Sequence, residues 1–245
     1  MRAWKISDVG ISRKGNPNED ICLLEDMGQG CMLGVVCDGM GGENAGEVAS
    51  EMAATAFRQA FLRDYDRWSA SHVEKCLKTA IKEANDRVFQ AAVNDASFSG
   101  MGTTIVAAVI GGDGEAVLAN VGDSRAYYIN EEGISQITTD HSLVNELIIR
   151  GEISRIEAQR HPKRNLITRA IGADPRVRCD TYVKKIRRGD YILLCSDGLN
   201  DQVSGPEIYY EVYESGKPEQ ACENLVTIAN SRGGSDNITI ILIEI

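Results

Sequence analysis

Apolar residues recur along the chain with two different spacings, which separate the expected strands from the expected helices. Short runs rich in β-branched and aromatic residues predict strands. Nine such runs lie at residues 3–8, 21–25, 31–37, 103–110, 116–120, 125–129, 178–184, 191–195 and 238–245. This number of strands requires more than one sheet, or one large sheet.

Two long stretches carry apolar residues at helical spacing instead. Residues 45–62 and 71–88 each place them on one stripe, and the second stretch opens with Ser71-His-Val-Glu, the pattern of a capping box. Because only a short join separates the two, we expect them to pack as an antiparallel pair. Further helical blocks are expected at residues 142–159 and 204–229, and a second capping box begins at Ser204.

The order of these elements indicates the fold class. Hairpins of strands with helices inserted in runs, rather than strict β-α alternation, predict an α+β fold of packed antiparallel sheets covered by helices. The chain has only five prolines in 245 residues and no low-complexity stretch that resembles a linker. We therefore predict a single domain over residues 1–245.

Acidic residues stand at the ends of several of these apolar strands. Four strand ends carry them, as Asp38-Gly39, Ser196-Asp197-Gly198, Asp236 and Glu19-Asp20. An ionised carboxylate at the mouth of a buried strand is unfavourable unless a cation compensates it. A cluster of oxygen ligands without nitrogen or sulfur selects Mg²⁺ or Mn²⁺ over Zn²⁺. The pattern predicts a metal site at one rim of the sheets.

Each of these acidic positions also has a simpler explanation. A single Asp-Gly dipeptide is usually a turn, and for any one of them alone that interpretation is preferred. The four together are harder to explain as turns. We expect the glycine after each aspartate to turn the chain sharply and to bring a backbone carbonyl near the metal. The three histidines form no zinc-hydrolase motif.

Composition narrows the possible partners and compartment. The formal charge of −10 disfavours nucleic acid and anionic lipid as partners. The N-terminus lacks the apolar core of a signal peptide, and no run reaches the length of a membrane span, so we expect a cytoplasmic protein. Seven cysteines without a Cys-x-x-Cys pair are interpreted as reduced core residues.

Six segments, in this order, resemble the metal-dependent protein serine/threonine phosphatases of type 2C, and the bacterial members in particular. The resemblance covers essentially the whole chain. The segments are Ser7-Asp8-Val9-Gly10 with Arg13 and Asn18-Glu19-Asp20; Val36-Cys37-Asp38-Gly39-Met40-Gly41-Gly42; Gly100-Met101-Gly102-Thr103-Thr104; Asn120-Val121-Gly122-Asp123-Ser124-Arg125; Cys195-Ser196-Asp197-Gly198-Leu199; and Gly234-Ser235-Asp236-Asn237-Ile238-Thr239.

The resemblance implies two stacked antiparallel sheets flanked by pairs of helices, with the metals at one end of this α-β-β-α sandwich. It implies hydrolysis of phosphoserine and phosphothreonine on proteins, in opposition to a serine/threonine kinase that is itself a partner. The cofactors would be two Mn²⁺ or Mg²⁺ ions and a possible third. A site with two metals activates the attacking water and stabilises charge on the phosphoryl oxygens, so no protein nucleophile is needed.

The resemblance also assigns roles to individual residues. Asp38 is similar to the carboxylate that bridges two metals, and the Gly39 carbonyl to a ligand of one of them. Asp197 and Asp236 are similar to ligands of the other ion. The resemblance also implies that Glu19 and Asp20 bind metal directly or through water, and the sequence does not tell which of the two does so. Asp123, with Asp197, would hold the third metal.

Arg13 is the candidate phosphate clamp, because its planar guanidinium matches two phosphate oxygens. The spacing from Arg13 to Glu19 is about two residues longer than in the usual bacterial pattern, so Lys14 is an alternative, as is a solvated basic pair in a loop. Where many eukaryotic relatives have a histidine suspected of donating a proton, this chain has Met40, which has no proton to give.

Residues 138–172 resemble the flap subdomain that borders the site in this family. His141 is interpreted as a helix-entry residue rather than as a catalytic acid. The flap also carries four basic residues that either attract phosphorylated substrates or, as we prefer, form a solvated face. These are Arg160, Lys163, Arg164 and Arg169.

Two alternatives to a general phosphatase remain open from the sequence. One is a relative with a narrow regulatory substrate, such as a phosphorylated anti-sigma-factor antagonist, which would share the same active-site residues. The other is a pseudo-phosphatase that only binds partners. Missing metal-site acids would be the signature of the second, and no such acid is missing from the six segments.

Overall fold

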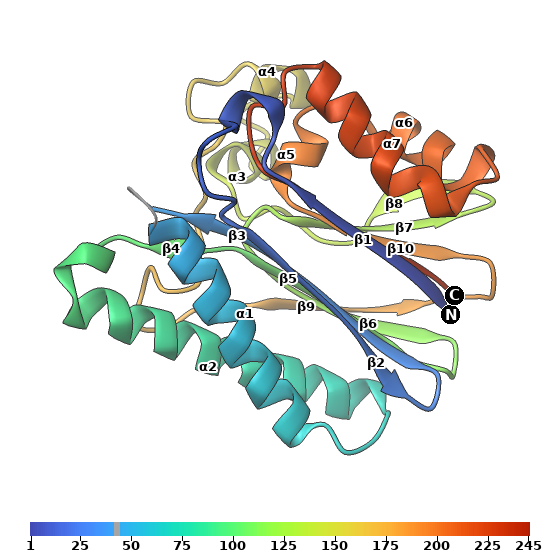
Figure 1. Ribbon diagram of the computed structural model, residues 1–245, viewed down its shortest axis with the longest axis horizontal. Helices are drawn as coiled ribbons and strands as arrows, with labels where there is room; N and C mark the ends of the chain where they lie inside the picture. Colours follow the sequence, from blue (N-terminus) through green and yellow to red (C-terminus); the bar gives the residue numbers. More distant parts are fainter. Residues whose placement is uncertain (42–44) are drawn as a thin grey trace.

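The structure, a computed structural model, describes residues 1–41 and 45–245. Two antiparallel sheets are stacked on each other, and helices cover the outer face of each (Figure 1). The predicted α+β sandwich is therefore confirmed. Gly42, the last residue of the segment around Asp38, lies outside the described residues.

One sheet has five strands in the order β1-β11-β10-β7-β8. Its members are β1 (Arg2–Asp8), β11 (Ile238–Glu244), β10 (Tyr191–Cys195), β7 (Arg125–Asn130) and β8 (Gly133–Gln136). All five residues of β10 and the first six of β11 are buried, because these two central strands have covered faces on both sides. Every strand of this sheet except β8 was predicted from the sequence.

The other sheet has the order β2-β3-β5-β6-β9, with β4 added to the end of β3. Its members are β2 (Asp20–Gly28), β3 (Cys31–Met40), β4 (Gly102–Thr103), β5 (Ile105–Ile110), β6 (Glu115–Val121) and β9 (Asp180–Lys185). The predicted strand at residues 103–110 is interrupted at Thr104, and both of its parts pair with β3. The register between β2 and β3 sets Asp20 opposite Asp38.

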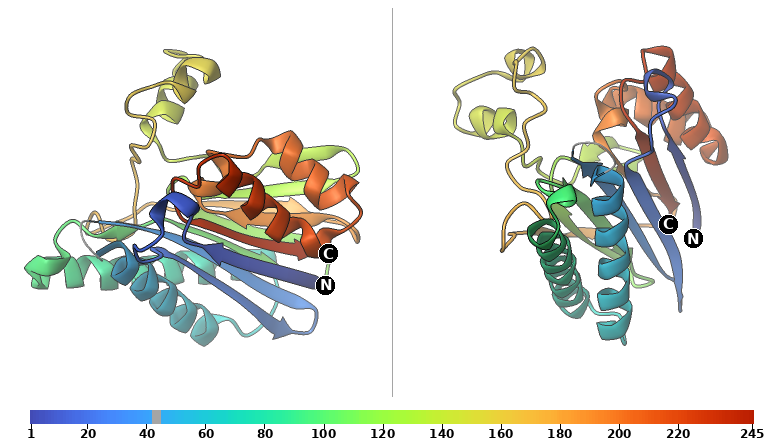
Figure 2. Two further views of the ribbon diagram at one scale, coloured as in Figure 1. Left: turned by 45° about the horizontal axis from the view of Figure 1, so that its top comes forward. Right: turned by 60° about the vertical axis from the view of Figure 1, so that its left-hand side comes forward.

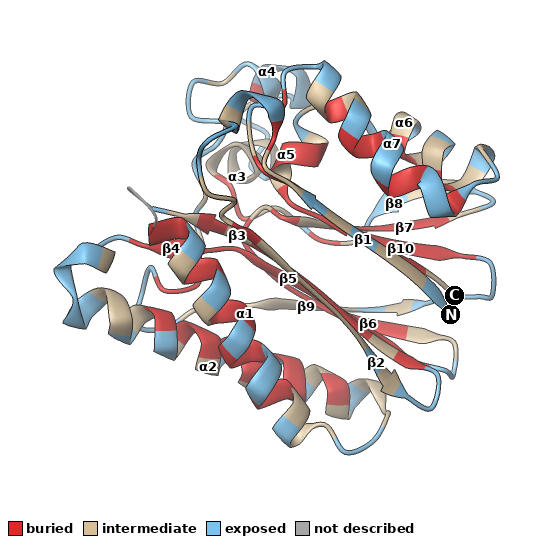
Figure 3. Ribbon diagram, in the orientation of Figure 1, coloured by how far each residue is buried: buried red, intermediate tan, exposed pale blue. Residues whose placement is uncertain are grey.

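Helices α1 (Ala45–Asp64) and α2 (Ala70–Asn94) cover the outer face of the second sheet as the predicted antiparallel pair (Figure 1). The first sheet is covered by α5 (Asp197–Asn200), α6 (Gly205–Tyr209), a π-helical turn at Tyr210–Glu214 and α7 (Pro218–Ser231). Three buried apolar clusters fill the spaces between these four layers (Figure 3).

Three helix predictions need correction. The cap of α2 is Ser69, whose side chain accepts the His72 N–H, so the capping box placed at Ser71 was wrong. The block at residues 142–159 is two short helices, α3 (Leu143–Ile149) and α4 (Arg155–Gln159), separated at Gly151, where φ is +72°. The block at residues 204–229 is likewise broken near Gly216, although the capping box at Ser204 is present.

The segment that carries α3 and α4 projects away from the sandwich (Figure 2). The chain segments that enter and leave this projection are joined by an antiparallel bridge between Ser142 and Ile167. After it, Ile171 bridges to Thr103 at the end of the second sheet. The predicted flap thus stands beside the sandwich end that holds Asp38 and Asp123. Among the helices of the described residues, none is both long and apolar enough to cross a bilayer.

Candidate metal centre

The interruption between β4 and β5 fixes the backbone of Asp38. The Asp38 N–H donates to Thr104 Oγ1 at 3.0 Å, and its carbonyl accepts the Thr104 N–H at 2.8 Å and the Thr103 hydroxyl at 2.8 Å. Both polar groups of the Asp38 backbone are therefore satisfied by Thr103 and Thr104. The break that the sequence analysis missed holds the bridging candidate in place.

The glycines after Asp38 and Asp197 allow neighbouring backbone segments to approach closely. Gly39 lies inside β3, which continues to Met40, so the predicted sharp turn at Gly39 was wrong. A Cβ on Gly39 would lie 2.1 Å from the Gly46 carbonyl oxygen, and one on Gly198 would lie 2.1 Å from that of Asn237. Only glycine lets these backbone segments meet beside the carboxylates.

Ser196 links two of the acidic strand ends. Its hydroxyl donates to Asp20 Oδ2 at 2.7 Å and accepts the Thr239 N–H at 3.0 Å. The next residue, Asp197, begins the short helix α5 at the end of buried strand β10. Asp20 and Asp197 are thus held near one another by a fully buried serine that the sequence analysis did not assign to the site.

Asn237 links the remaining acidic residues. Its side-chain oxygen accepts the Glu19 N–H at 2.8 Å, and its side-chain nitrogen donates to the Val9 carbonyl at 2.8 Å. Its own N–H donates to Asp236 Oδ1 at 2.9 Å. The only signal for this role in the sequence was the position of Asn237 inside a family segment, directly after Asp236.

Arg13 is the cation of this cluster. Its guanidinium pairs with Glu19 Oε2 at 2.6 Å and with Asp236 Oδ1. Lys14, the alternative, is exposed and has no ion-pair partner among the described residues. The longer loop before Glu19 therefore still brings Arg13, rather than Lys14, to the carboxylates.

Burial and mutual repulsion act on the central carboxylates. Burial raises the pKa of Asp20 to about 6, and that of Asp123 to about 6 as well. The pKa values of Asp38 and Asp197 lie well above the ordinary range, first because of burial and then because other aspartates of the cluster are close. For Asp38 and Asp197, a bound cation would offset both the burial and the repulsion by neighbouring aspartates.

These observations fit a bound cation. Asp20 Oδ1 is buried and has no hydrogen-bond partner among the described residues, so it is available to a metal. Arg13 forms ion pairs with the outer members of the acidic cluster, Glu19 and Asp236. Within residues 1–41 and 45–245, no three acidic, histidine or cysteine side chains form a complete set of ligands for an ion.

Comparisons with known proteins identify the family of this chain. The family model for protein phosphatase 2C matches residues 10–228. The chain belongs to the protein phosphatase 2C family. It is 40% identical over 210 residues to the serine/threonine phosphatase stp of Listeria monocytogenes. The matched region covers 86% of this chain and 83% of that protein.

Solved structures of this family superpose over nearly the whole phosphatase. The serine/threonine phosphatase Stp1 from Staphylococcus aureus is 39% identical, with a TM-score of 0.93 over 100% of this chain and 95% of that one. The catalytic domain of the phosphatase PstP, in complex with two manganese ions, is 29% identical, with a TM-score of 0.83 over 99% and 97%. The chain is therefore a metal-dependent protein serine/threonine phosphatase.

The flap of this phosphatase is tied to the loop that carries Asp123. His141 Nδ1 accepts the Gly122 N–H at 3.0 Å, and the His141 N–H donates to the Gly122 carbonyl at 3.0 Å. The other ring nitrogen, Nε2, lies 3.2 Å from Asp180 Oδ2 and 3.0 Å from Arg169 Nη1. Burial lowers the pKa of His141, which keeps this ring neutral near pH 7.

Replacing His141 with alanine is expected to cost about 1–3 kcal/mol of the free energy of unfolding, because the buried Gly122 N–H loses its acceptor. Urea denaturation followed by circular dichroism measures the change. His161→Ala is the matched control, because the ring of His161 accepts only a local bond from Lys163 within the flap. Equal losses in the two variants would show that His141 is not the anchor.

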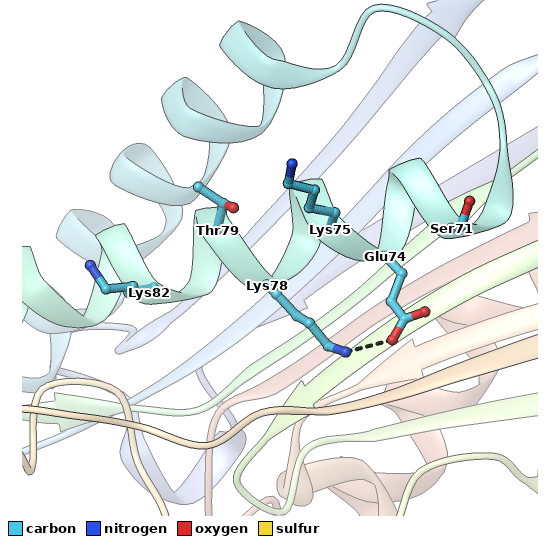
Figure 4. Close-up of a pocket in the computed structure, with 6 residues that line it drawn as sticks. All are labelled: Ser71, Glu74, Lys75, Lys78, Thr79 and Lys82. Carbon is cyan, nitrogen blue, oxygen red and sulfur yellow. Dashed lines mark hydrogen bonds and ion pairs between the residues drawn. The ribbon is translucent and has the colours of Figure 1, made fainter.

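A cleft of about 1100 Å³ lies between the flap and the carboxylates, and its lining includes Asp123 and Asp197. A second, shallower hollow of about 440 Å³ lies along the outer face of α2 (Figure 4). Its lining residues, among them Lys75, Lys78 and Lys82, all come from this one helix, and Lys78 pairs with Glu74 at 2.5 Å. None of the acidic residues of the metal centre lines this hollow, so the cleft is the candidate active site.

Proposed function

We propose that the phosphatase hydrolyses phosphoserine and phosphothreonine on proteins with a water activated by two Mn²⁺ or Mg²⁺ ions at this cluster. Asp38, the Gly39 carbonyl, Asp197 and Asp236 would hold the two ions, with Glu19 and Asp20 contributing directly or through water. A weaker third ion would lie between Asp123 and Asp197. The observation that carries the proposal is the group of aspartates with raised pKa values at one end of the sandwich, together with the buried Asp20 Oδ1, which has no hydrogen-bond partner among the described residues.

Bound ions would supply positive charge at the phosphoryl oxygens and make a water acidic enough to attack near neutral pH. The chain's own contribution is positional. Thr103 and Thr104 hold the backbone of Asp38, while Ser196 and Asn237 fix Asp20 and Asp236. Met40 has no proton to donate to the leaving group, so we assign that step to no side chain of the chain.

Arg13 would orient the phosphate. Its guanidinium already lies between Glu19 and Asp236, and cations bound to those carboxylates would weaken its hold on them. Its five donors would then be available to two phosphate oxygens. Arg13 would therefore be both an ion-pair partner of the metal-free cluster and the phosphate clamp of the loaded one.

The variant Arg13→Ala is expected to raise KM for a phosphothreonine peptide roughly ten-fold, about 1.4 kcal/mol of lost binding. Lys14→Ala removes the same charge one residue away, on an exposed side chain, and should leave KM within about two-fold. Steady-state phosphate release at saturating Mn²⁺ gives both values. A larger effect for Lys14→Ala than for Arg13→Ala would reverse the assignment.

The residues over 1–245 would act as one domain, with residues 138–172 as its flap. The partners would be proteins phosphorylated on serine or threonine, including a serine/threonine kinase whose signalling the phosphatase reverses. The proposal is tested by measuring phosphate release from a phosphothreonine peptide with Mn²⁺ and with EDTA. Hydrolysis that requires Mn²⁺ supports it, and a folded, metal-loaded protein that cleaves neither this peptide nor p-nitrophenyl phosphate would refute it.

A further inference from the structure

The cleft between the flap and the sandwich has walls of opposite character. The sandwich contributes acidic residues, including Asp123, Asp197 and Asp201, from the same end of the sheets as the proposed metal centre. The flap contributes residues of α3 and α4. A molecule that places its phosphate at the carboxylate cluster therefore extends between these two walls.

The flap wall is unusually apolar for an exposed element. Val144, Ile148 and Ile149 of α3 line the cleft, and no residue of α3 is buried. Ile149 is 69% exposed. A short helix that lines a cleft with three β-branched aliphatic residues, none of them buried, fits a surface that another chain covers on binding.

The flap is also locally basic on a protein with a net charge of −10. Residues 142–169 contain six Arg and Lys residues but only three Glu. Most of the cations are engaged or point elsewhere. Arg150 pairs with Glu146, Arg169 pairs with Asp180, and neither lines the cleft.

Two flap cations do line the cleft, and they differ in their surroundings. Arg164 donates to Asn165 at 3.2 Å and lies near Asp201, where it partly offsets the burial that raises the pKa of that carboxyl. Arg155, at the start of α4, has no ion-pair partner among the described residues. A carboxylate bound in the cleft could therefore pair with Arg155 without displacing a carboxylate of the described residues.

We propose that this cleft binds the segment of the phosphoprotein next to the phosphorylated residue, and that it selects an acidic side chain at Arg155 and an apolar one at Ile148 and Ile149. The inference rests on the proposed function of the carboxylate cluster. The volume of the cleft, about 1100 Å³, lies at the upper end of the range for ligand sites and suits several peptide residues. Its apolar and basic flap wall complements a segment that carries both an apolar and an acidic side chain.

The chain offers a matched control for each residue. Arg160 is a second exposed arginine of the flap that does not line the cleft, and Ile156 is 69% exposed, like Ile149, but also lies outside it. The experiment compares kcat/KM with Mn²⁺ for phosphothreonine peptides that carry Glu or Gln, and Leu or Ser, at each of the four positions on either side. The proteins are wild type, Arg155→Gln, Arg160→Gln, Ile149→Ser and Ile156→Ser.

The wild type is expected to prefer Glu over Gln, and Leu over Ser, by roughly three- to ten-fold at one or two positions, mainly through KM. Arg155→Gln should lose the preference for Glu, and Ile149→Ser should lose the preference for Leu. Each preference is the ratio of kcat/KM for the two peptides measured with the same variant. Arg160→Gln and Ile156→Ser should keep both preferences. No preference in the wild type, or an equal loss in a control variant, would overturn the proposal.

Two other results have separate meanings. Absence of any hydrolysis, including that of p-nitrophenyl phosphate, would refute the proposed function and this inference with it, whereas hydrolysis without preference would refute the inference alone. Sedimentation of the same proteins tests a different occupant. A dimer that Ile149→Ser disrupts, while peptide preferences stay unchanged, would assign the flap surface to a second copy of the chain and overturn the proposal.

Discussion

Asp38→Asn is expected to lower kcat/KM for a phosphothreonine peptide by roughly a thousand-fold, about 4 kcal/mol of transition-state stabilisation. The same variant should be more stable than the wild type when no metal is present. Asp38 is the carboxylate whose pKa burial raises well above the ordinary range, with Asp20, Asp197, Asp123 and Asp236 adding to it. A neutral amide of the same size removes that repulsion but cannot bridge two cations.

The gain in stability is expected to be about 1–3 kcal/mol at pH 7.5 in EDTA, the range for an unsatisfied buried polar group. Urea denaturation in EDTA measures it, and Asp113→Asn, on an exposed turn, is the matched control and should change neither stability nor activity. An Asp38→Asn protein that is both inactive and less stable than the wild type without metal would show that Asp38 serves the fold rather than the ions.

Manganese is expected to stabilise the phosphatase more at pH 7.5 than at pH 5.5. Folding raises the pKa of Asp20 to about 6, against an ordinary value near 4, so the native state binds the proton more tightly than the unfolded state. Such a group contributes stability that is fully present below about pH 4 and is lost as the pH rises through about 6. For Asp20 the loss is at most about 3 kcal/mol, and a cation at the cluster would restore it.

The measurement is the melting temperature with Mn²⁺ and with EDTA at the two pH values, for the wild type and Asp20→Asn. Without metal, the stability advantage of Asp20→Asn over the wild type should grow as the pH rises from 5 to 7, because only the wild type loses a proton there. This comparison cancels the titration of groups that do not interact with Asp20. An advantage that stays constant over this range would contradict the raised pKa of Asp20.

The carboxylates were predictable from the sequence because each abuts an apolar strand. The bonds that hold them were not, because they join residues far apart in the chain. Ser196 reaches Asp20 across 176 positions, and Asn237 reaches Glu19 across 218. No local pattern of hydrophobic and polar positions encodes such a pairing, which depends on the register of two stacked sheets.

Other differences between the predicted and the observed strands and helices had a local cause. The β-branched run around Thr104 reads as one strand, and only the bonds of Thr104 to Asp38 break it. The breaks in the two helical blocks were visible in the sequence, as Gly151 in one and as Gly216 with Pro218 in the other. The periodic apolar residues outweighed these signals in the prediction.

The number of Mn²⁺ ions bound at full activity tests the central claim most directly. Isothermal titration of the metal-free protein with Mn²⁺, with activity followed in parallel, should give at least two ions per chain, and activity should appear as the second ion binds. Asp38→Asn should lose that stoichiometry together with the activity. Full activity with a single ion per chain, or activity that survives complete chelation, would contradict a cluster of carboxylates that works by holding two metals.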